Sequence, residues 1–235
     1  MESVNHCGVC AMPLVYATES VTKTCALCGK EEKALIYCPA GHYVCDACHS
    51  KAALEVLEQL ILTSKTTDPA AILEQVISHP SVPMHGPEHH VIVPAAIVAA
   101  VRNSSYSLPE RAVEQAIERA RKVPGGWCGL CGDCGAAVGA GIAVSVITEA
   151  TPLTGKSRTL AMAATSQALS RMLDEQPRCC KRASRIAIQS SVEFLREHLG
   201  INLSQAKPVK CTYTYRNQQC AKQECPYYAE NARAV

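Results

Sequence analysis

Cysteine is the most distinctive chemical feature of this 235-residue chain, which contains fifteen cysteines, many of them in close pairs. In the first fifty residues, four pairs offer sulfur or imidazole at the short spacing typical of zinc ligands. The pairs are Cys7 and Cys10, Cys25 and Cys28, Cys38 and His42, and Cys45 and Cys48. Because two ligands on one tight turn suit a metal better than a disulfide network, the pattern predicts two tetrahedral zinc sites. Stabilising a module that lacks a core is the simplest role for them.

The spacing leaves open which ligands share an ion. The run from Cys25 to Cys48 resembles the first six ligands of a RING-type cross-brace, and Cys7 with Cys10 would complete the set. This resemblance implies one ion bound by Cys25, Cys28, Cys45 and Cys48, and another bound by Cys7, Cys10, Cys38 and His42. The alternative is a zinc ribbon, in which the Cys7 pair shares an ion with the Cys25 pair. In either case we expect Gly29 to close its turn with a positive φ.

A second group of cysteines lies in the middle of the chain. Cys128, Cys131 and Cys134 have the spacing of [4Fe–4S] ligands. They precede an apolar stretch expected to be a helix, whose N-terminal amides would favour thiolate, most of all at Cys134. The adjacent Cys179 and Cys180 lie among basic residues, which would lower their pKa values or hold an anion. These five cysteines are candidate cofactor ligands, although two ordinary buried thiols would equally explain the adjacent pair.

A histidine-rich loop is the next candidate. His85, Glu88, His89 and His90 place three imidazoles and a carboxylate within six residues. Such a set could bind a metal or transfer protons beside a thiolate, so we treat it, together with Cys134, as a candidate catalytic group. The alternative is a Pro/Gly turn whose histidines cap helices and satisfy backbone groups.

The C-terminal segment holds Cys211, Cys220 and Cys225, and Pro226 follows the last cysteine as in many ferredoxin-type strings. Three ligands are one short of a closed metal site. Either a cysteine from elsewhere joins them, or an iron stays open to substrate, or the segment is a zinc clip.

The elements that must position these residues are mainly helical. We expect a zinc-binding module at 1–49, a helical cysteine-rich bundle at 50–202 and a cysteine-containing tail at 203–235. Helices are predicted from the apolar periodicity and the capping signals. Their ranges are 51–63, 69–77, 91–102, 107–122, 135–148, 157–174 and 179–199. Pro94 is tolerable only in the first turn of its helix, Ser107 to Glu110 is expected to form a capping box, and 79–90 is expected to be a loop.

Composition restricts the function further. The net charge is +2 and no long basic run is present, which argues against nucleic acid as a partner. No apolar stretch is long enough to span a membrane. Residues 1–13 lack the basic and apolar pattern of a signal peptide, so we expect the paired cysteines to lie in a reducing, cytoplasmic location.

Three segments together resemble a family of bacterial and archaeal cysteine-rich proteins. They are Pro83-Met-His-Gly-Pro-Glu-His-His90, Gly126-Trp-Cys-Gly-Leu-Cys-Gly-Asp-Cys-Gly-Ala-Ala-Val-Gly139 and Pro177-Arg-Cys-Cys-Lys-Arg182. The resemblance covers roughly Ser50 to the C-terminus. It implies that Cys128, Cys134, Cys179, Cys180 and the histidine loop act together. Because the family pattern does not generally include Cys131, a cluster held by those four cysteines is an alternative to one held by the 128–134 triad.

These observations favour an iron–sulfur protein of anaerobic metabolism that handles electrons or sulfur, with a redox protein as partner and a small sulfur-containing substrate. A thiol redox enzyme using Cys131 and Cys134, with Cys179 and Cys180 as resolving thiols, is the first alternative. The second is a zinc-folded interaction module. Its expected partner is a methyltransferase, because some members of the resembling family lie beside or are fused to SAM-dependent methyltransferases.

Overall fold

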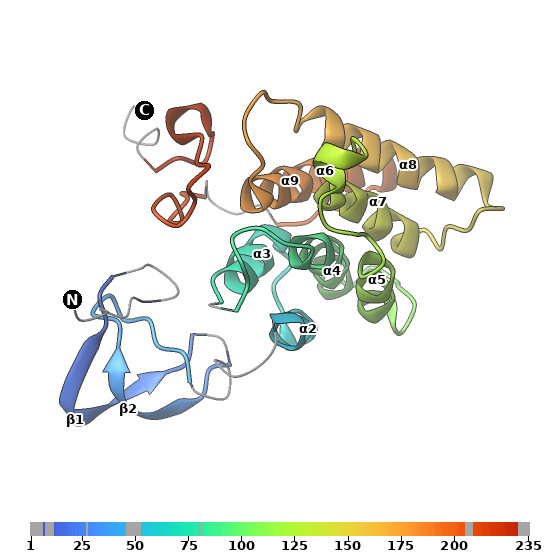
Figure 1. The fold of residues 1–235 in the computed structure, drawn as a ribbon. Helices are drawn as coiled ribbons and strands as arrows, with labels where there is room; N and C mark the ends of the chain where they lie inside the picture. Colours follow the sequence, from blue (N-terminus) through green and yellow to red (C-terminus); the bar gives the residue numbers. More distant parts are fainter. Residues whose placement is uncertain are drawn as a thin grey trace.

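The computed structural model describes residue 7 and residues 12–26, 28–45, 53–79, 81–204 and 209–229. Within these residues the chain forms eight α-helices and one two-stranded sheet (Figure 1). In chain order they are β1 Val15–Thr24, β2 Glu31–Tyr37, α2 Ala53–Thr63, α3 Pro69–Ile77, α4 Glu88–Asn103, α5 Ala112–Ala120, α6 Trp127–Leu130, α7 Gly135–Ile147, α8 Gly155–Ser170, α9 Cys180–Leu199 and the short 3₁₀ helix η1 Lys222–Glu224. The predicted, mostly helical architecture is confirmed. None of the helices in this part of the chain combines the length and the apolar character needed to cross a membrane.

The N-terminal module contains a β-hairpin that the sequence analysis missed. β1 and β2 pair antiparallel with Val21 opposite Ala34 and Thr24 opposite Glu31, and the register is irregular between Tyr16 and Val21. Exposure partly alternates along both strands, as expected for a half-buried ribbon. The hairpin lies at one end of the molecule (Figure 1). Its turn carries Cys25 and Cys28, so strand pairing fixes the position of these sulfurs.

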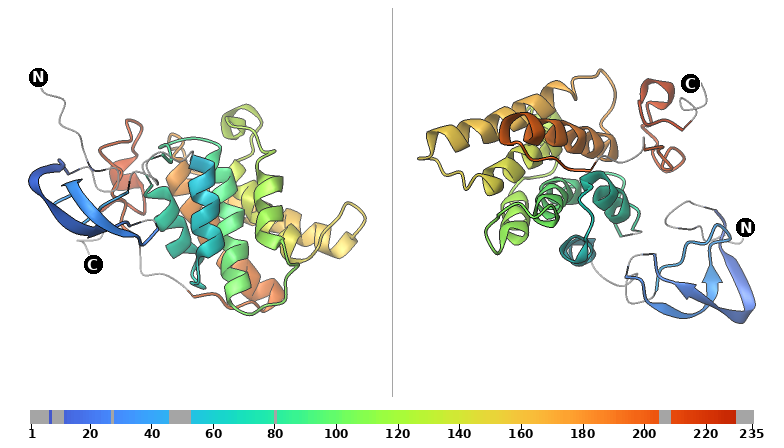
Figure 2. Two further views of the ribbon diagram at one scale, coloured as in Figure 1. Left: turned by 90° about the horizontal axis from the view of Figure 1, so that it is seen from below. Right: turned by 180° about the vertical axis from the view of Figure 1, so that it is seen from behind.

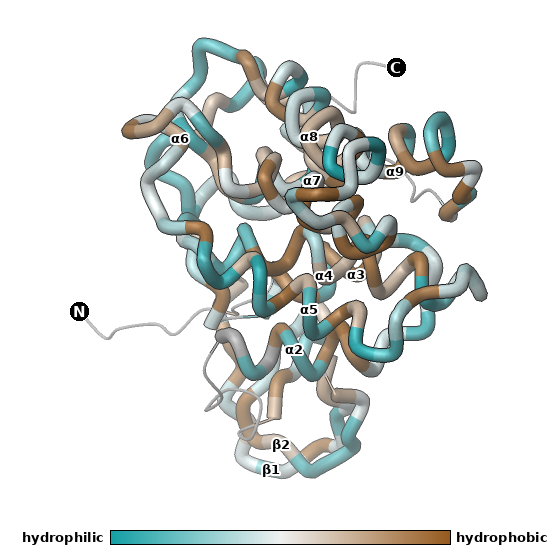
Figure 3. The backbone as a smooth tube through the Cα atoms, turned by 90° about the vertical axis from the view of Figure 1, so that its right-hand side faces the viewer, coloured by the Kyte–Doolittle hydropathy of each residue, from teal (hydrophilic) through white to brown (hydrophobic). Residues whose placement is uncertain are grey.

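The helical core is built around α4. This helix packs against α3, α5, α7 and α9, and every residue from Val91 to Val101 is buried. The helices lie together beside the hairpin (Figure 2), and apolar residues are frequent along them (Figure 3). With few aromatic side chains available, close packing depends on small residues. A Cβ atom added at Gly139 of α7, for example, would lie only 2.8 Å from Cδ of Pro94.

Two predicted helix starts were wrong. α4 begins at Glu88, not near Val91, so Pro94 is its seventh residue and lies in the helix interior rather than in the first turn. A proline there costs about 3 kcal/mol, which complete burial of the apolar helix offsets. The capping box is also not formed. α5 begins only at Ala112, and Arg111 at its N-cap makes no side-chain cap hydrogen bond.

The predicted start of α3 and the predicted end of α9 are confirmed, whereas the predicted end of α8 is not. The Asp68 carboxylate accepts the N–H groups of Ala70 and Ala71 at 2.9 and 3.3 Å, and Pro69 opens α3 as expected. Gly200 ends α9 with φ 67°, and the Ile201 N–H reaches the Leu195 carbonyl at 3.1 Å. α8 ends at Ser170, four residues before its predicted end. The first two residues predicted for the helix at 51–63 lie outside the described residues.

Candidate metal centres

Cys7, Cys38 and His42 form the first compact group in the N-terminal module. One ligand atom from each lies within 4.8 Å of the others, and both sulfurs are buried. Nδ1 of His42 is also buried, with no hydrogen-bond partner among the described residues. The backbone N–H of Ala40 points at the Cys38 sulfur at 3.4 Å, the arrangement of a metal-binding turn. These three residues could hold a metal ion.

Cys25, Cys28 and Cys45 form the second compact group, again within 4.8 Å of one another. The sulfurs of Cys28 and Cys45 are 3.8 Å apart. Zinc–sulfur bonds of about 2.3 Å in a tetrahedron place two sulfurs about 3.8 Å apart, so the spacing suits a single ion. The Cys45 N–H points at the Cys25 sulfur at 3.4 Å, and Gly29 closes the turn with φ 73°, as the sequence predicts.

The members of the two groups indicate which of the predicted ligands share an ion, a question that the sequence spacing left open. Cys7 lies with Cys38 and His42, whereas Cys25 and Cys28 lie with Cys45. This is the grouping of a cross-brace, since a zinc ribbon would place Cys7 beside Cys25 and Cys28. The two remaining predicted ligands, Cys10 and Cys48, lie outside the described residues.

A cavity of about 590 Å³ lies between the start of α4, α6, the start of α7, the end of α8 and the start of α9. Its lining includes four cysteines and two histidines from three segments that are far apart in the sequence. They are Cys128, Cys134, Cys179, Cys180, His85 and His90. In the described part of the chain, none of these cysteines forms a disulfide. Tertiary packing therefore gathers the cysteines that the family resemblance associates with one another.

The remaining predicted cluster ligand, Cys131, is exposed and is not part of the cavity lining. It caps the four-residue helix α6 through its backbone, donating its N–H to the Trp127 carbonyl at 2.9 Å. The structure thus separates Cys131 from Cys128 and Cys134, although all three have equal spacing in the sequence.

Cys134 is the N-cap of α7, and Cys180 is the first residue of α9. Burial raises the pKa of the Cys134 thiol, although the amides of Ala136 and Ala137 act in the opposite direction. Burial likewise raises the pKa of the Cys180 thiol. The amide of Gly86 acts to lower this pKa, and the charge of Cys134 acts to raise it. The expected lowering of these pKa values was therefore wrong in its net direction, because loss of hydration outweighs the helix amides.

The same holds for Cys179, whose pKa is raised by burial even though Arg182 contributes an amide and a charge that lower it. Thiols that are protonated at neutral pH are poor nucleophiles. This weighs against the thiol redox enzyme in which Cys131 and Cys134 form the dithiol and Cys179 and Cys180 resolve it. A metal centre does not require thiols that are already deprotonated at neutral pH, because the metal displaces the proton when it binds.

The histidine loop divides into two parts. His85 and His90 line the cavity, whereas Glu88 and His89 do not. His90 Nδ1 lies 3.1 Å from the Val123 carbonyl and His85 Nε2 lies 3.3 Å from Oδ1 of Asn217. His89 is fully buried, and desolvation lowers its pKa to about 3, so it is neutral. Glu88, His89 and His90 belong to the first turn of α4, so the predicted loop ends earlier than expected.

Gly135 allows α7 to approach the cavity histidine. A Cβ atom at this position would overlap the ring of His90. Glycine directly after Cys134 is therefore required so that the sulfur and the imidazole can lie on the same wall. A glycine beside a cysteine ligand is a signal that sequence reading could have used.

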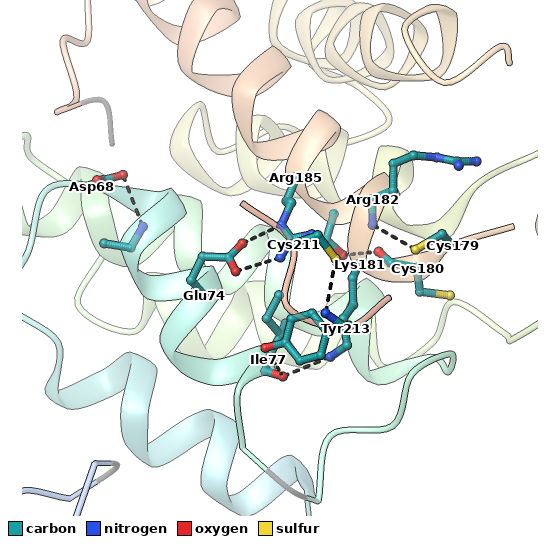
Figure 4. A network of polar contacts seen from close by, with 12 residues as sticks. Asp68, Glu74, Ile77, Cys179, Cys180, Lys181, Arg182, Arg185, Cys211 and Tyr213 are labelled. Carbon is teal, nitrogen blue, oxygen red and sulfur yellow. Dashed lines mark hydrogen bonds and ion pairs between the residues drawn. The ribbon is translucent and has the colours of Figure 1, made fainter. Parts of the chain in front are cut away.

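The C-terminal tail packs on α3 and α9 through a buried network (Figure 4). The Tyr213 hydroxyl donates to the Ile77 carbonyl at 3.2 Å, and the same carbonyl accepts the ammonium of Lys181 at 2.9 Å. Lys181 also lies 4.3 Å from the centre of the Tyr213 ring. Arg185 pairs with Glu74 and lies 5.3 Å from the Tyr227 ring. This network positions Cys211, which precedes Tyr213 by two residues.

Fold and sites together define a helical, cysteine-rich protein with two candidate metal-binding groups at its N-terminus and a cysteine-lined cavity between its helices. The chain belongs to the Family of unknown function (DUF5714), whose model matches residues 57–228. The match includes every cysteine of the cavity and of the tail, and the N-terminal module precedes it. Comparison with curated proteins and with solved structures returns no match for this chain.

Proposed function

We propose that this protein is an iron–sulfur protein that transfers electrons or sulfur and that binds a [4Fe–4S] cluster at the central cavity. The observation that carries this proposal is the presence of Cys128, Cys134 and Cys180 together in the lining of one cavity. Cys128 and Cys134 precede α7, whereas Cys180 begins α9. The charge of Cys128 acts on Cys134, and that of Cys134 acts on Cys180. Cysteine thiolates are the usual protein ligands of such clusters.

The environment of these sulfurs fits a thiolate-bound cluster. Backbone N–H groups of Ala136, Ala137 and Gly86 face Cys134 and Cys180 and stabilise negative charge on sulfur. Among the residues that the structure describes, compact groups of the single-ion kind occur only in the N-terminal module. No three of the described cavity cysteines thus lie within 4.8 Å of one another, as expected when each binds a different iron.

Three cysteines leave one iron without a protein sulfur, and the cavity is of a size that accommodates small ligands. A soft metal site favours a sulfur-containing compound as substrate. The cluster would supply single electrons and a binding position for sulfur. Each electron passed to the substrate must be replaced from outside, so the proposal includes a one-electron donor protein of low potential as partner.

His85 and His90 are the residues that we propose for proton transfer at the cavity. Because the Val123 carbonyl accepts a hydrogen bond from Nδ1 of His90, neutral His90 keeps Nε2 as the nitrogen that can receive a proton. Asn217 orients the ring of His85 through Nε2. Glu88 and His89 lie outside the cavity lining, so they would help to position His90 in the first turn of α4 and would not contact the substrate.

For the N-terminal module we propose two zinc ions in a structural role. The 3.8 Å separation of Cys28 and Cys45 supports a single tetrahedral ion there. Nδ1 of His42 is buried and has no hydrogen-bond partner in the described part of the chain, which supports a second ion.

Anaerobic purification of the full chain tests the cluster. We expect a broad absorbance at about 400 nm, typical of thiolate-bound clusters, and stoichiometric iron and sulfide. Cys134→Ser should lower the iron content by about four atoms per chain. Cys131→Ser is the matched control, because Cys131 is exposed and outside the cavity lining, and it should leave the iron content unchanged. Colourless protein containing zinc alone would exclude the proposal.

A further inference from the structure

A second, much smaller cavity lies between the start of α9 and the tail. Four cysteines bound it, namely Cys179, Cys211, Cys220 and Cys225. The tail by itself supplies three of them, and the structure adds the fourth from the N-cap of α9. We propose that these four cysteines bind a second iron–sulfur cluster, separate from the centre at the large cavity.

Backbone amides point at three of the four sulfurs. The N–H of Arg182 lies 3.5 Å from the Cys179 sulfur, that of Tyr213 lies 3.5 Å from Cys211, and that of Lys222 lies 3.4 Å from Cys220. In the last two cases the donor follows the cysteine by two residues. The N-terminal module shows the same turn, where Ala40 donates to Cys38. Such amides stabilise thiolate ligands and tune the potential of a bound cluster.

The spacing of these sulfurs distinguishes a cluster from a single ion. Sulfurs bound to one tetrahedral zinc ion lie about 3.8 Å apart. In the described chain, three ligand atoms come within 4.8 Å of one another only in the N-terminal module, so no three of the four sulfurs here are gathered as closely as single-ion ligands. In a cluster each cysteine binds its own iron, which requires wider spacing.

Buried positive charge lies beside the site: Arg182 and Arg185 line the cavity, and Lys181, outside the lining, interacts electrostatically with Cys179. Lys181, Arg182 and Arg185 are at most 6% exposed. Arg185 pairs with Glu74 and Arg182 pairs with Asp174, but no described carboxylate lies within ion-pair distance of Lys181. A buried ammonium without a counter-ion is costly. A cluster held by four thiolates carries net negative charge and would compensate for it.

The two sites meet at consecutive residues. Cys180 belongs to the large cavity with Cys134, whereas the sulfur of Cys179 is influenced by Cys211 and Cys225 and lines both cavities. With all four positions closed by protein, the second cluster would bind no substrate and would pass electrons. The single peptide unit between the two cysteines would then connect it to the substrate site. This last step rests on the proposed function, whereas the second site itself does not.

Iron and sulfide analysis of anaerobically purified full-length variants tests the inference. Unmodified protein should contain about eight iron atoms per chain, and both Cys211→Ser/Cys220→Ser and Cys134→Ser should retain about four. Cys131→Ser should retain all. If the tail variant keeps the full iron content, or if zinc is found at the tail site, the second cluster is excluded. If Cys134→Ser keeps the full iron content while the tail variant loses iron, the tail cluster is supported and the proposed cluster at the large cavity is contradicted.

Spectroscopy covers the case in which the tail variant does not fold. Cys134→Ser protein reduced with dithionite should still give the electron paramagnetic resonance signal of one isolated cluster, which belongs to the tail site. Absence of that signal in folded, helical protein overturns the inference. In the unmodified protein, magnetic coupling should broaden the signal because the two centres are adjacent.

Discussion

The Arg185 guanidinium binds the Glu74 carboxylate through two hydrogen bonds, from Nε at 2.7 Å and from Nη2 at 2.8 Å. The pair joins α9 to α3, and Arg185 also lies beside the rings of Tyr213 and Tyr227. A contact between residues separated by 111 positions thus supports the surface on which the tail packs.

Glu74→Gln should destabilise the protein, because it leaves the buried guanidinium without its counter-charge. Glu74 is partly exposed, so we expect a loss of about 2–3 kcal/mol in the free energy of unfolding, below the full value for a buried pair. Urea denaturation measures this loss in the free energy of unfolding. Glu197→Gln, which removes the exposed pair with Arg196, is the control and should change stability by less than about 0.5 kcal/mol. Equal effects of the two substitutions would contradict the prediction.

Gly135→Ala should perturb the cavity, because the added methyl group overlaps the His90 ring. Overpacking of this kind typically costs about 1–3 kcal/mol, and we expect a reduced iron content as well. Gly129→Ala is the control from the same region, since its Cβ would meet no atom within 4 Å. Thermal unfolding and iron analysis of both variants measure the difference. Unchanged stability and iron content in Gly135→Ala would contradict the prediction, because the cavity would then accommodate the added methyl group.

His89 should make the protein sensitive to acid. Burial lowers the pKa of His89 to about 3 from its ordinary value of 6.5. Between these values the unfolded chain binds one proton more than the folded chain, so the free energy of unfolding falls as the pH falls. At about 1.4 kcal/mol per pH unit, His89 accounts for a loss of about 2 kcal/mol between pH 7 and pH 5. His89→Gln should show a correspondingly smaller loss, and identical pH dependence in both proteins would be incompatible with a neutral buried His89.

Paired substitutions in the N-terminal module decide how its ligands share two ions. In the cross-brace grouping, Cys7→Ser/Cys38→Ser removes two ligands of one ion and should lower the zinc content by about one per chain. Cys7→Ser/Cys25→Ser damages both sites and should remove about two. Zinc analysis after gel filtration measures this. A zinc ribbon predicts the reverse order for the two variants.

The sequence alone predicted features that depend on residues only a few positions apart, namely helix ends and paired metal ligands. Asp68 and Pro69 predict the start of α3, and Gly200 predicts the end of α9, because capping depends on residues a few positions apart. The pairs in the first fifty residues indicate metal for the same reason, since two ligands on one turn need no distant partner. Pro94 was misjudged because its tolerance depends on burial of the whole helix.

Tertiary structure decided which cysteines meet. Cys128, Cys131 and Cys134 are evenly spaced in the sequence, but only Cys128 and Cys134 line the large cavity. Cys179 and Cys180 are neighbours, yet only Cys179 also lines the cavity of the tail. Spacing along the chain determines only which ligands can share a turn. The partner that completes a site depends on how α4, α7 and α9 pack and on how the tail binds to them.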